Sequence, residues 1–354
     1  DWLELVEDDV RTALANTVLE NVPIVRVSAR TRQGLPELLQ ALNNCLEERP
    51  PRPDLRRPRL PIDRVFIIPG FGTVVTGTLL DGSLRLGDEL EIQPSGLRGR
   101  VRGLQTHKKK EEQAVPGSRT AVNISGVNIE QVQRGDVVVH PGDYQPTRRM
   151  DVQFRLLPDV SQALEHNTQV KLFLGAAEVL ARLRLLGTER LNPGETGWLQ
   201  LELDQPLIAV RGDRYILRRP SPGETLGGGM IVDAHPKGRH KRFGSDVLSR
   251  LESLAQGDPI DILLQALVAT GSGSLSEVIN CSHLDDQVAQ EAVRTLLDAG
   301  IMIAMETSGE VASLPPNSLV MSLGAWNELS MRVIQEITTY HRNYPLRRGL
   351  PREE

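Results

Sequence analysis

Short runs of β-branched and other apolar residues, separated by glycine, proline and aspartate, occupy most of the middle of the sequence. They fall into two blocks, residues 58–142 and residues 147–236. The first block contains RVFII, TVVTGTLL, GDELEIQ, RGRVRGLQ, SRTAVNI and DVVVH; the second contains MDVQFRLL, TQVKLFLG, AEVLARLRLLG, TGWLQLEL, LIAV and DRYILRR. Because such runs at regular spacing are typical of closed all-β folds, the sequence predicts two β-barrels in tandem.

Residues 1–50 have a different pattern, in which helical and strand-like segments follow one another. The apolar run VPIVRV, at residues 22–27, predicts a strand, and residues 35–46 predict an amphipathic helix. An earlier helix is predicted from the spacing of Leu3, Val6, Val10 and Leu14. These elements indicate the end of an α/β domain. The following stretch, ERPPRPDLRRPRLP, cannot continue a helix because of its prolines and predicts a linker.

The pattern becomes helical again after the second block. Asp258 and Pro259 predict a capped helix start, SLSEVIN a second helix, and residues 284–299 a third helix. The expected core of the third helix is Leu284, Val288, Val293, Leu296 and Leu297. IMIAM, TSGE and VASL then predict a hairpin, so residues 243–316 have the α+β order of a winged helix. A helix at residues 325–340 would begin a truncated second winged helix, in residues 322–354.

Composition excludes several classes of protein. A net charge of −5 and 3% aromatic residues argue against a uniformly basic coat and against rows of base-stacking side chains. No apolar run approaches the about 18 to 20 residues of a membrane span, so we expect no membrane insertion. Cys45 and Cys281 lie far apart, which favours a reducing, cytoplasmic location and two buried thiols rather than a disulfide or a metal site.

The stretch PGFGTVVTG, at residues 69–77, contains three glycines and raises the question of a phosphate-binding loop. A dinucleotide-binding loop needs G-x-G-x-x-G in front of a helix, whereas this stretch has a longer spacing and four β-branched residues. A P-loop needs Gly-Lys, a pair that the sequence lacks. The stretch therefore predicts a tight hairpin whose glycines permit positive φ.

The same stretch also carries a family resemblance. LPIDRVFIIPGFGTVVTGTLLDGSLRLGDELEI resembles the start of the second domain of translational GTPases of the EF-Tu type, in which this barrel helps to hold the aminoacyl end of a tRNA. The similarity continues through VPGSRTAVNISG and RGDVVVHPG to GDRYILRRPSPGETLGGGMIVD. VRVSAR is similar to the last guanine-contacting loop of a GTPase domain, which implies that role for Ser28 and Ala29.

Within these GTPases, the chain is most similar to the selenocysteine-specific elongation factors, the family called SelB. The carriers of that resemblance are GAAEVLARLRLLG, GETLGGGMIVDAHP and YHRNYPLRRGLPREE, and a third-domain barrel followed directly by winged helices. The resemblance implies delivery of selenocysteinyl-tRNA to the ribosome at UGA codons by a monomeric factor. In that family an mRNA hairpin binds winged helices at the extreme C-terminus, which we expect this chain to lack.

The resemblance implies that Asp63, Arg64 and Arg119 recognise selenocysteine. In the general elongation factors, acidic residues precede VF and an Asn lies in the segment that matches GSRTAV. A selenol is a stronger acid than a thiol, whose pKa is about 8.5, so selenocysteine is an anion near neutral pH and arginine can select it. Asp63 would orient a guanidinium or the esterified amino group. The alternative is a surface ion pair worth about 0 to 1 kcal/mol, and some relatives carry His where Arg64 stands.

Two runs of cations could bind the tRNA backbone, and one of them is residues 211–242, with eight basic residues against three acidic ones. The other contains Arg98, Arg100, Arg102, Lys108, Lys109 and Lys110, and its three arginines alternate along a predicted strand, so that they would share one face. The alternative is an ordinary solvated surface. The third predicted helix, by contrast, has four acidic residues against Arg294, so we expect the winged helix to be a spacer rather than an RNA reader.

GTP and Mg²⁺ are expected only in a longer parent protein. The sequence has no GxxxxGK[ST], no D-x-x-G and no N-K-x-D, and it begins with Asp1 as if cut from a larger chain, so the chain itself is predicted to hold no cofactor and to hydrolyse no GTP. Two other functions stay open. One is a related GTPase that carries a different tRNA, and the other is a non-catalytic winged-helix and β-barrel binding module.

Overall fold

The structure is a computed structural model that describes residues 2–15, 17–47, 56–70, 72–282, 284–305, 314–345 and 347. It contains two compact units, Asp1–Arg52 and Pro53–Glu354. In the first unit, α1 (Trp2–Leu14) and α2 (Leu35–Glu47) confirm the two predicted helices. The predicted strand at residues 22–27 is wrong, because these residues form no regular secondary structure and pair with no described strand. A strand needs a hydrogen-bonded neighbour, and the described part of this unit provides none.

Both cysteines are exposed, which contradicts the expectation of buried thiols. Cys45 lies on α2, a helix with no buried residue. The apolar face of α2 therefore lacks a covering layer within the described part of the unit. Cys281 lies near the end of α5 (Leu275–Ser282), where the chain leaves the helix. Residue type alone did not reveal which helix faces are covered.

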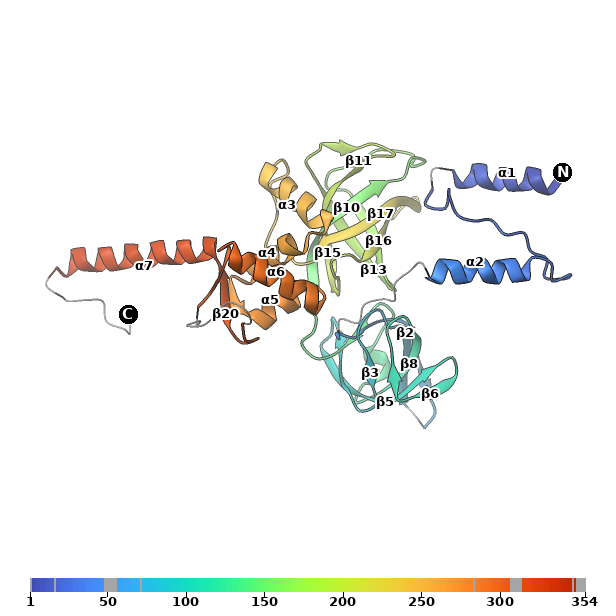
Figure 1. Cartoon of the computed structure of the whole chain (residues 1–354), viewed down its shortest axis with the longest axis horizontal. Coiled ribbons are helices and arrows are strands. Elements are labelled where there is room, and N and C mark those ends of the chain that lie inside the picture. Colours follow the sequence, from blue (N-terminus) through green and yellow to red (C-terminus); the bar gives the residue numbers. More distant parts are fainter. Residues whose placement is uncertain are drawn as a thin grey trace. The chain divides into compact units, whose positions relative to one another are not determined.

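The first barrel confirms the first predicted block (Figure 1). Six antiparallel strands close in the order β4-β9-β1-β2-β8-β5, because β5 pairs again with β4. Their bounds are β1 Arg59–Ile68, β2 Gly72–Thr78, β4 Glu89–Gln93, β5 Leu97–Thr106, β8 Arg119–Ser125 and β9 Val137–Val139. Shorter pieces are β3 Leu84–Arg85, β6 Lys109–Glu111, β7 Gln113–Ala114 and the 3₁₀ turn η1 Ile129–Gln131. Alternate residues such as Leu60, Ile62, Val75 and Val122 fill its interior.

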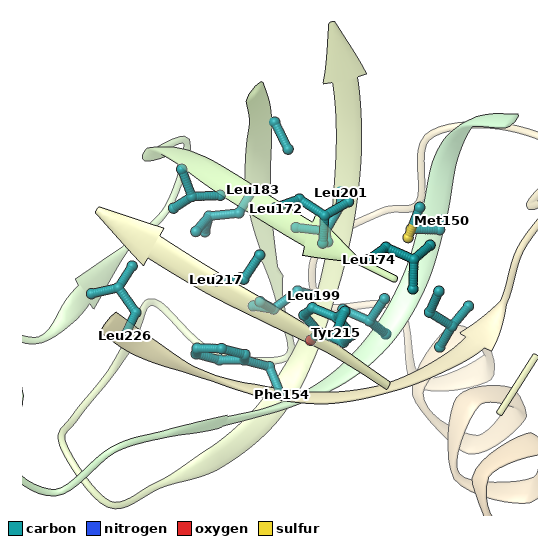
Figure 2. Packing of buried hydrophobic residues seen from close by; sticks show 14 of the residues in the cluster. Met150, Phe154, Leu172, Leu174, Leu183, Leu199, Leu201, Tyr215, Leu217 and Leu226 are labelled. Carbon is teal, nitrogen blue, oxygen red and sulfur yellow. The ribbon is translucent and has the colours of Figure 1, made fainter. Parts of the chain in front are cut away.

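The second barrel confirms the second block, and it is also closed and six-stranded, in the order β10-β15-β13-β12-β16-β17. Its strands are β10 Thr147–Leu156, β12 Gln169–Leu174, β13 Ala177–Leu186, β15 Thr196–Leu207, β16 Arg214–Arg219 and β17 Glu224–Asp233. A small pair, β11 Leu164–Glu165 and β14 Arg190–Leu191, flanks it. Figure 2 shows its interior, where Phe154, Leu199 and Leu217 converge from different strands.

The C-terminal region, residues 243–345, combines helices with a small sheet. Its helices are α3 Ser245–Gln256, α4 Pro259–Thr270, α5 Leu275–Ser282, α6 Asp286–Asp298 and α7 Leu323–Asn343. As predicted, the Asp258 side chain caps α4 by accepting a hydrogen bond from the amide of Ile260. The sequence patterns did not single out α3 as a helix.

The predicted hairpin in this region is only partly described, so its second strand stays a prediction. β19 (Met302–Ala304) matches IMIAM, but it pairs with β20 (Leu319–Ser322), which also pairs with β18 (Ser272–Ser274). TSGE and most of VASL lie outside the described residues.

The buried face of α6 differs from the predicted core at one position. Val288 is exposed, and Ala289 and Ala292 are buried beside Val293 and Leu296, because 289, 292, 293 and 296 share one helical face.

The helix α3 is fastened to the second barrel by apolar and polar contacts. Leu251 and Leu254 of α3 pack with Leu186 and Val232 of the barrel. Asp151, which is fully buried in β10, accepts a hydrogen bond from the Gln200 amide at 2.9 Å and lies 2.6 Å from His240 Nε2 and 3.4 Å from the Arg250 guanidinium. These partners compensate for the burial of a carboxylate.

The second barrel offers a test of this packing on adjacent residues of β16. Leu217 is fully buried, whereas Ile216 is half exposed. Leu217→Ala should lower the free energy of unfolding by about 2 to 5 kcal/mol through the lost contacts and the cavity, and Ile216→Ala by much less. Urea denaturation followed by Trp198 fluorescence, with Trp2 and Trp326 replaced by Phe, measures both. Equal losses would contradict the described register.

Candidate functional site

Asp63 lies at a β-bulge in β1. Ile62 pairs with Gly77 of β2, but Arg64 pairs with Thr76, so that Asp63 is an extra residue with no partner of its own on β2. Gly77 makes this bulge possible, because a Cβ atom there would lie 2.1 Å from the carbonyl oxygen of Pro61. Regular alternation after the buried Ile62 turns Asp63 outward, and the extra residue then turns Arg64, which would otherwise face the interior, outward beside it.

Arg119 reaches Asp63 from β8 on the outer surface of the barrel. Arg119 pairs with Thr78 of β2, and β2 separates β8 from β1. The Arg119 guanidinium donates to both carboxylate oxygens of Asp63, with 3.1 Å from Nη2 to Oδ1 and a closer contact from Nη1 to Oδ2. Strands lie about 4.8 Å apart, so a long side chain is needed to span two of them. The result is a bidentate ion pair.

The hydroxyl of Thr76 completes this arrangement. Thr76 Oγ1 donates to Asp63 Oδ1 over 2.7 Å. Thr76 follows Val75, which is fully buried in the barrel interior, so the alternation of the strand turns Thr76 to the outside. Sequence reasoning missed Thr76 because it lies within PGFGTVVTG, a stretch interpreted only as a hairpin. A threonine opposite the candidate acid on a predicted neighbouring strand was the available signal.

The electrostatics keep Asp63 ionised. Partial burial raises the pKa of Asp63, but hydrogen bonds from Arg119 and Thr76 and the nearby charges of Arg119 and Arg64 outweigh it, so the pKa lies below the ordinary value. The hydrogen bonds to Asp63 raise the pKa of Arg119 in turn. Because the pKa of Asp63 is lowered in the folded chain, its contribution to stability is present above the unfolded-state pKa and is lost as the pH falls through the folded-state pKa.

The site still has guanidinium groups open to solvent. The Arg119 side chain is 52% exposed and the Asp63 side chain 29%. Arg64 is exposed next to the bulge and has no ion pair with any residue that the structure describes. Asp63, Arg64 and Arg119 therefore form a cluster with a formal charge of +1 on an open surface. Phe66, Ile67 and Ile68, further along β1, place exposed apolar side chains beside it.

The stretch PGFGTVVTG forms the β1–β2 hairpin, as predicted. Gly70 and Gly72 have φ values of 81° and 89°, which confirms their expected conformational role, and Phe71 lies outside the described residues. Gly77 is not among the residues with positive φ. Its role is steric, since it lets β2 approach the bulge that carries Asp63.

The six candidate tRNA-backbone cations are all exposed and lie on β5, β6 and the turn between them. Arg98, Arg100 and Arg102 alternate with less exposed residues of β5, and a second bulge occurs at Arg102; that the three arginines share one face stays a prediction. Arg100 contacts Glu89 at 3.0 Å, an exposed ion pair that leaves the guanidinium accessible. His107 and Lys108 form a two-residue hairpin turn in which both have positive φ, and Lys109 and Lys110 follow on β6.

Ser28 and Ala29 lie in the first unit, in a tight turn in front of α2. The Ser28 hydroxyl accepts a hydrogen bond from the amide of Thr31 at 3.2 Å, and its amide donates to the carbonyl of Gln33 at 2.9 Å. This local geometry is that of an ordered loop leading into a helix. In the part of the chain that the structure describes, no helix is long and apolar enough to cross a membrane.

Comparison with known families agrees with this architecture. The model of elongation factor Tu domain 2 matches residues 72–139, and the model of the beta-barrel domain of selenocysteine-specific elongation factor matches residues 149–238. The two barrels therefore define a chain built from translation-factor domains. More particularly, the chain is SelB-like, because it combines a match to elongation factor Tu domain 2 with a match to the beta-barrel domain of selenocysteine-specific elongation factor.

Individual relatives show how far the similarity extends. The chain is 38% identical over its whole length to the selenocysteine-specific elongation factor of Desulfomicrobium baculatum, of which it covers 55%. It is 31% identical over 63% of its length to the protein of that name from Haemophilus influenzae, covering 35% of it. The chain thus spans about half or less of the length of these relatives.

Solved structures share the fold. A bacterial selenocysteine-specific elongation factor, EF-Sec, superposes with a TM-score of 0.72 at 22% identity, covering 97% of this chain and 52% of that one. Translation elongation factor SelB from Methanococcus maripaludis, in its apo form, gives a TM-score of 0.56 at 27% identity over 66% of this chain and 56% of that one.

The cluster predicts how the pKa of Asp63 responds to substitution. Arg119→Met removes both a hydrogen-bond donor pair and a charge, so the pKa of Asp63 should rise toward its ordinary value. Arg64→Met, the matched control, removes only a nearby charge and should raise the pKa less. NMR titration of the Asp63 carboxyl carbon measures both shifts. An equal rise in the two variants would be inconsistent with the bidentate contact.

Proposed function

We propose that this chain is the part of a selenocysteine-specific elongation factor that holds the aminoacyl end of selenocysteinyl-tRNA. The parent protein would use GTP and Mg²⁺ to deliver that tRNA to the ribosome at UGA codons. The observation that carries the proposal is the cationic cluster of Asp63, Arg64 and Arg119 on the open face of a translation-factor domain 2 barrel.

The charge of the cluster matches a selenolate. A selenocysteine side chain is anionic near neutral pH, whereas the side chain of serine, which the tRNA carries before conversion, is neutral. Hydrogen bonds to charged groups contribute about 1.5 to 3 kcal/mol, and neutral ones about 0.5 to 1.5 kcal/mol. The difference corresponds to a preference of roughly tenfold for the anion. Neutral hydroxyls would gain no comparable interaction with Arg64 and Arg119.

Asp63 would serve the recognition indirectly. With Arg119 held by both of its Nη atoms, the remaining N–H groups of that guanidinium are fixed in direction and open to solvent. Fixed donors lose less conformational entropy when a ligand binds. The Asp63 carboxylate, kept ionised by its lowered pKa, is also suited to accept a hydrogen bond from the esterified amino group of the aminoacyl end.

The rest of the chain would support tRNA binding. The cations of β5 and β6 are suited to phosphate oxygens, and the loop of Ser28 and Ala29 to the guanine contact of a GTPase domain. The C-terminal region would be a winged-helix spacer, because the exposed side of α6 is acidic. Binding of an mRNA hairpin would belong to other winged helices of the parent protein, and the factor would act as a monomer in the cytoplasm.

Substitution of Arg119 tests the proposal. Arg119→Met should reduce the ratio of affinities for selenocysteinyl-tRNA over seryl-tRNA about tenfold, because it removes a charged donor pair. Arg100→Met is the matched control on the same barrel and should leave that ratio unchanged even if it weakens both complexes. Fluorescence titration with amide-linked aminoacyl-tRNAs measures the ratio.

Other results of this titration would identify another function. An unchanged ratio in Arg119→Met would sink the proposed role of the cluster. A wild-type preference for an initiator tRNA would favour a different tRNA carrier of the same GTPase class. Lack of affinity for any tRNA would favour a non-catalytic binding module.

A further inference from the structure

The strand that carries Asp63 is anchored at its first residue by the second barrel. Arg59, the first residue of β1, forms a bidentate ion pair with Asp213, in the loop between β15 and β16, with 2.7 Å between Nη2 and Oδ1. The two side chains are only 12% and 16% exposed. The Arg59 guanidinium also lies 6.0 Å from the centre of the Tyr144 ring. A buried, hydrogen-bonded ion pair of this kind fixes geometry, because either charge left alone would be costly.

The second barrel also touches β1 two residues before Asp63. A Cβ atom at Gly175, in the turn between β12 and β13, would lie 3.4 Å from Pro61 Cβ. One at Gly135 would lie 2.9 Å from the Cα atom of Ala177. The amide of Gly135 in turn donates to the carbonyl of Ile62 at 2.9 Å. The turn of the second barrel is therefore packed against the backbone that leads directly into the bulge.

A third anchor precedes β1. The Arg57 guanidinium donates to the carbonyl of Asn280 in α5, and the Arg57 carbonyl accepts a hydrogen bond from Tyr144 Oη at 3.0 Å. Arg57 is buried. The chain just before the bulge is thus held by the second barrel and by the C-terminal region, whereas Arg119 is held by β8 of the first barrel alone.

Asp63 and Arg119 are thus held by different parts of the chain, so the geometry of their ion pair depends on contacts far from the site. Between Ile62 and Ile68, the bulge is the one place where a residue of β1 lacks a paired partner on β2, so small displacements of the preceding residues are absorbed there. A bidentate contact tolerates little displacement before its hydrogen bonds weaken. We propose that Arg59 and Asp213 are positioning residues for the aminoacyl site, and that their ion pair sets the Asp63–Arg119 geometry through β1. This proposal rests on the function proposed above for that site.

Two single substitutions test the positioning role, because one removes the positive charge of the Arg59–Asp213 pair and the other removes its negative charge. If the ion pair positions the bulge, Arg59→Met and Asp213→Asn both loosen the Asp63–Arg119 contact, and both raise the pKa of Asp63. If the pair acted only through its electric field, loss of the cation would raise that pKa and loss of the anion would lower it. A field effect would also be weak, since four strand residues span about 13 Å, more than the Debye length at physiological salt.

The readout is NMR titration of the Asp63 carboxyl carbon in the full chain, which needs no tRNA. Arg148→Met is the control, because that guanidinium donates a hydrogen bond to the Asp204 carbonyl, at 2.7 Å, on the second barrel and contacts no described residue of β1. We expect upward pKa shifts in both test variants and none in the control. In the wild-type chain the amide of Val210 donates to the Asp213 carboxylate at 3.0 Å. Asp213→Asn retains a side-chain oxygen that can accept this hydrogen bond, so this variant can still be measured if Arg59→Met unfolds. Shifts of opposite sign, or no shift in Asp213→Asn, would overturn the positioning role.

The affinity ratio separates this inference from the proposed function. Both test variants should also lower the preference for selenocysteinyl-tRNA over seryl-tRNA, by about tenfold, as expected from loosening a charged hydrogen-bond pair. The pKa of Asp63 could rise in both variants while the wild-type chain shows no preference for selenocysteinyl-tRNA. That result would support the positioning of Asp63 and refute the proposed function of the site. A wild-type preference that survives in both variants would refute the positioning role alone.

Discussion

The candidate site depends on one irregularity, the bulge that leaves Asp63 without a partner on β2. Alternation already turns Asp63 outward, because Leu60 and Ile62 lie in the barrel interior; the extra residue turns the next side chain, Arg64, outward beside it instead of inward. Gly77 provides the space for the bulge, and Thr76 and Arg119 hold the carboxylate of Asp63. The ion pair, the lowered pKa of Asp63 and the fixed direction of the Arg119 donors all follow from this local geometry.

Sequence patterns predicted the barrels but not their irregularities. Strand position follows from the alternation of apolar runs and turn residues, which locates β1, β2, β5 and β8 well. Register depends on which residues of two strands meet, and a run such as RGRVRGLQ contains no sign of the bulge at Arg102. The strand β20, which pairs with β19, was not predicted, and most of the predicted strand VASL lies outside the described residues.

The sequence predicted which three residues form the candidate site, but it did not predict the contacts that hold them together. Asp63, Arg64 and Arg119 came from a family resemblance, because nothing in their spacing along the chain brings residues 63 and 119 together. Thr76 and Gly77 were hidden in a stretch whose glycines drew attention to backbone conformation. The exposure of Cys45 could not be foreseen either, because an amphipathic helix such as α2 indicates a covered face only if a partner element is present.

Together, the contacts describe a candidate site that is supported by more than one part of the chain. The first barrel presents the cationic cluster, and the second barrel and the C-terminal region hold the start of the strand that carries its acid. The most direct test of the central claim is an NMR spectrum of the Arg119 guanidinium with and without selenocysteinyl-tRNA. The account predicts a shift of the Arg119 Nε–H resonance with selenocysteinyl-tRNA and little change with seryl-tRNA. Identical spectra with the two tRNAs, with binding evident elsewhere on the chain, would contradict it.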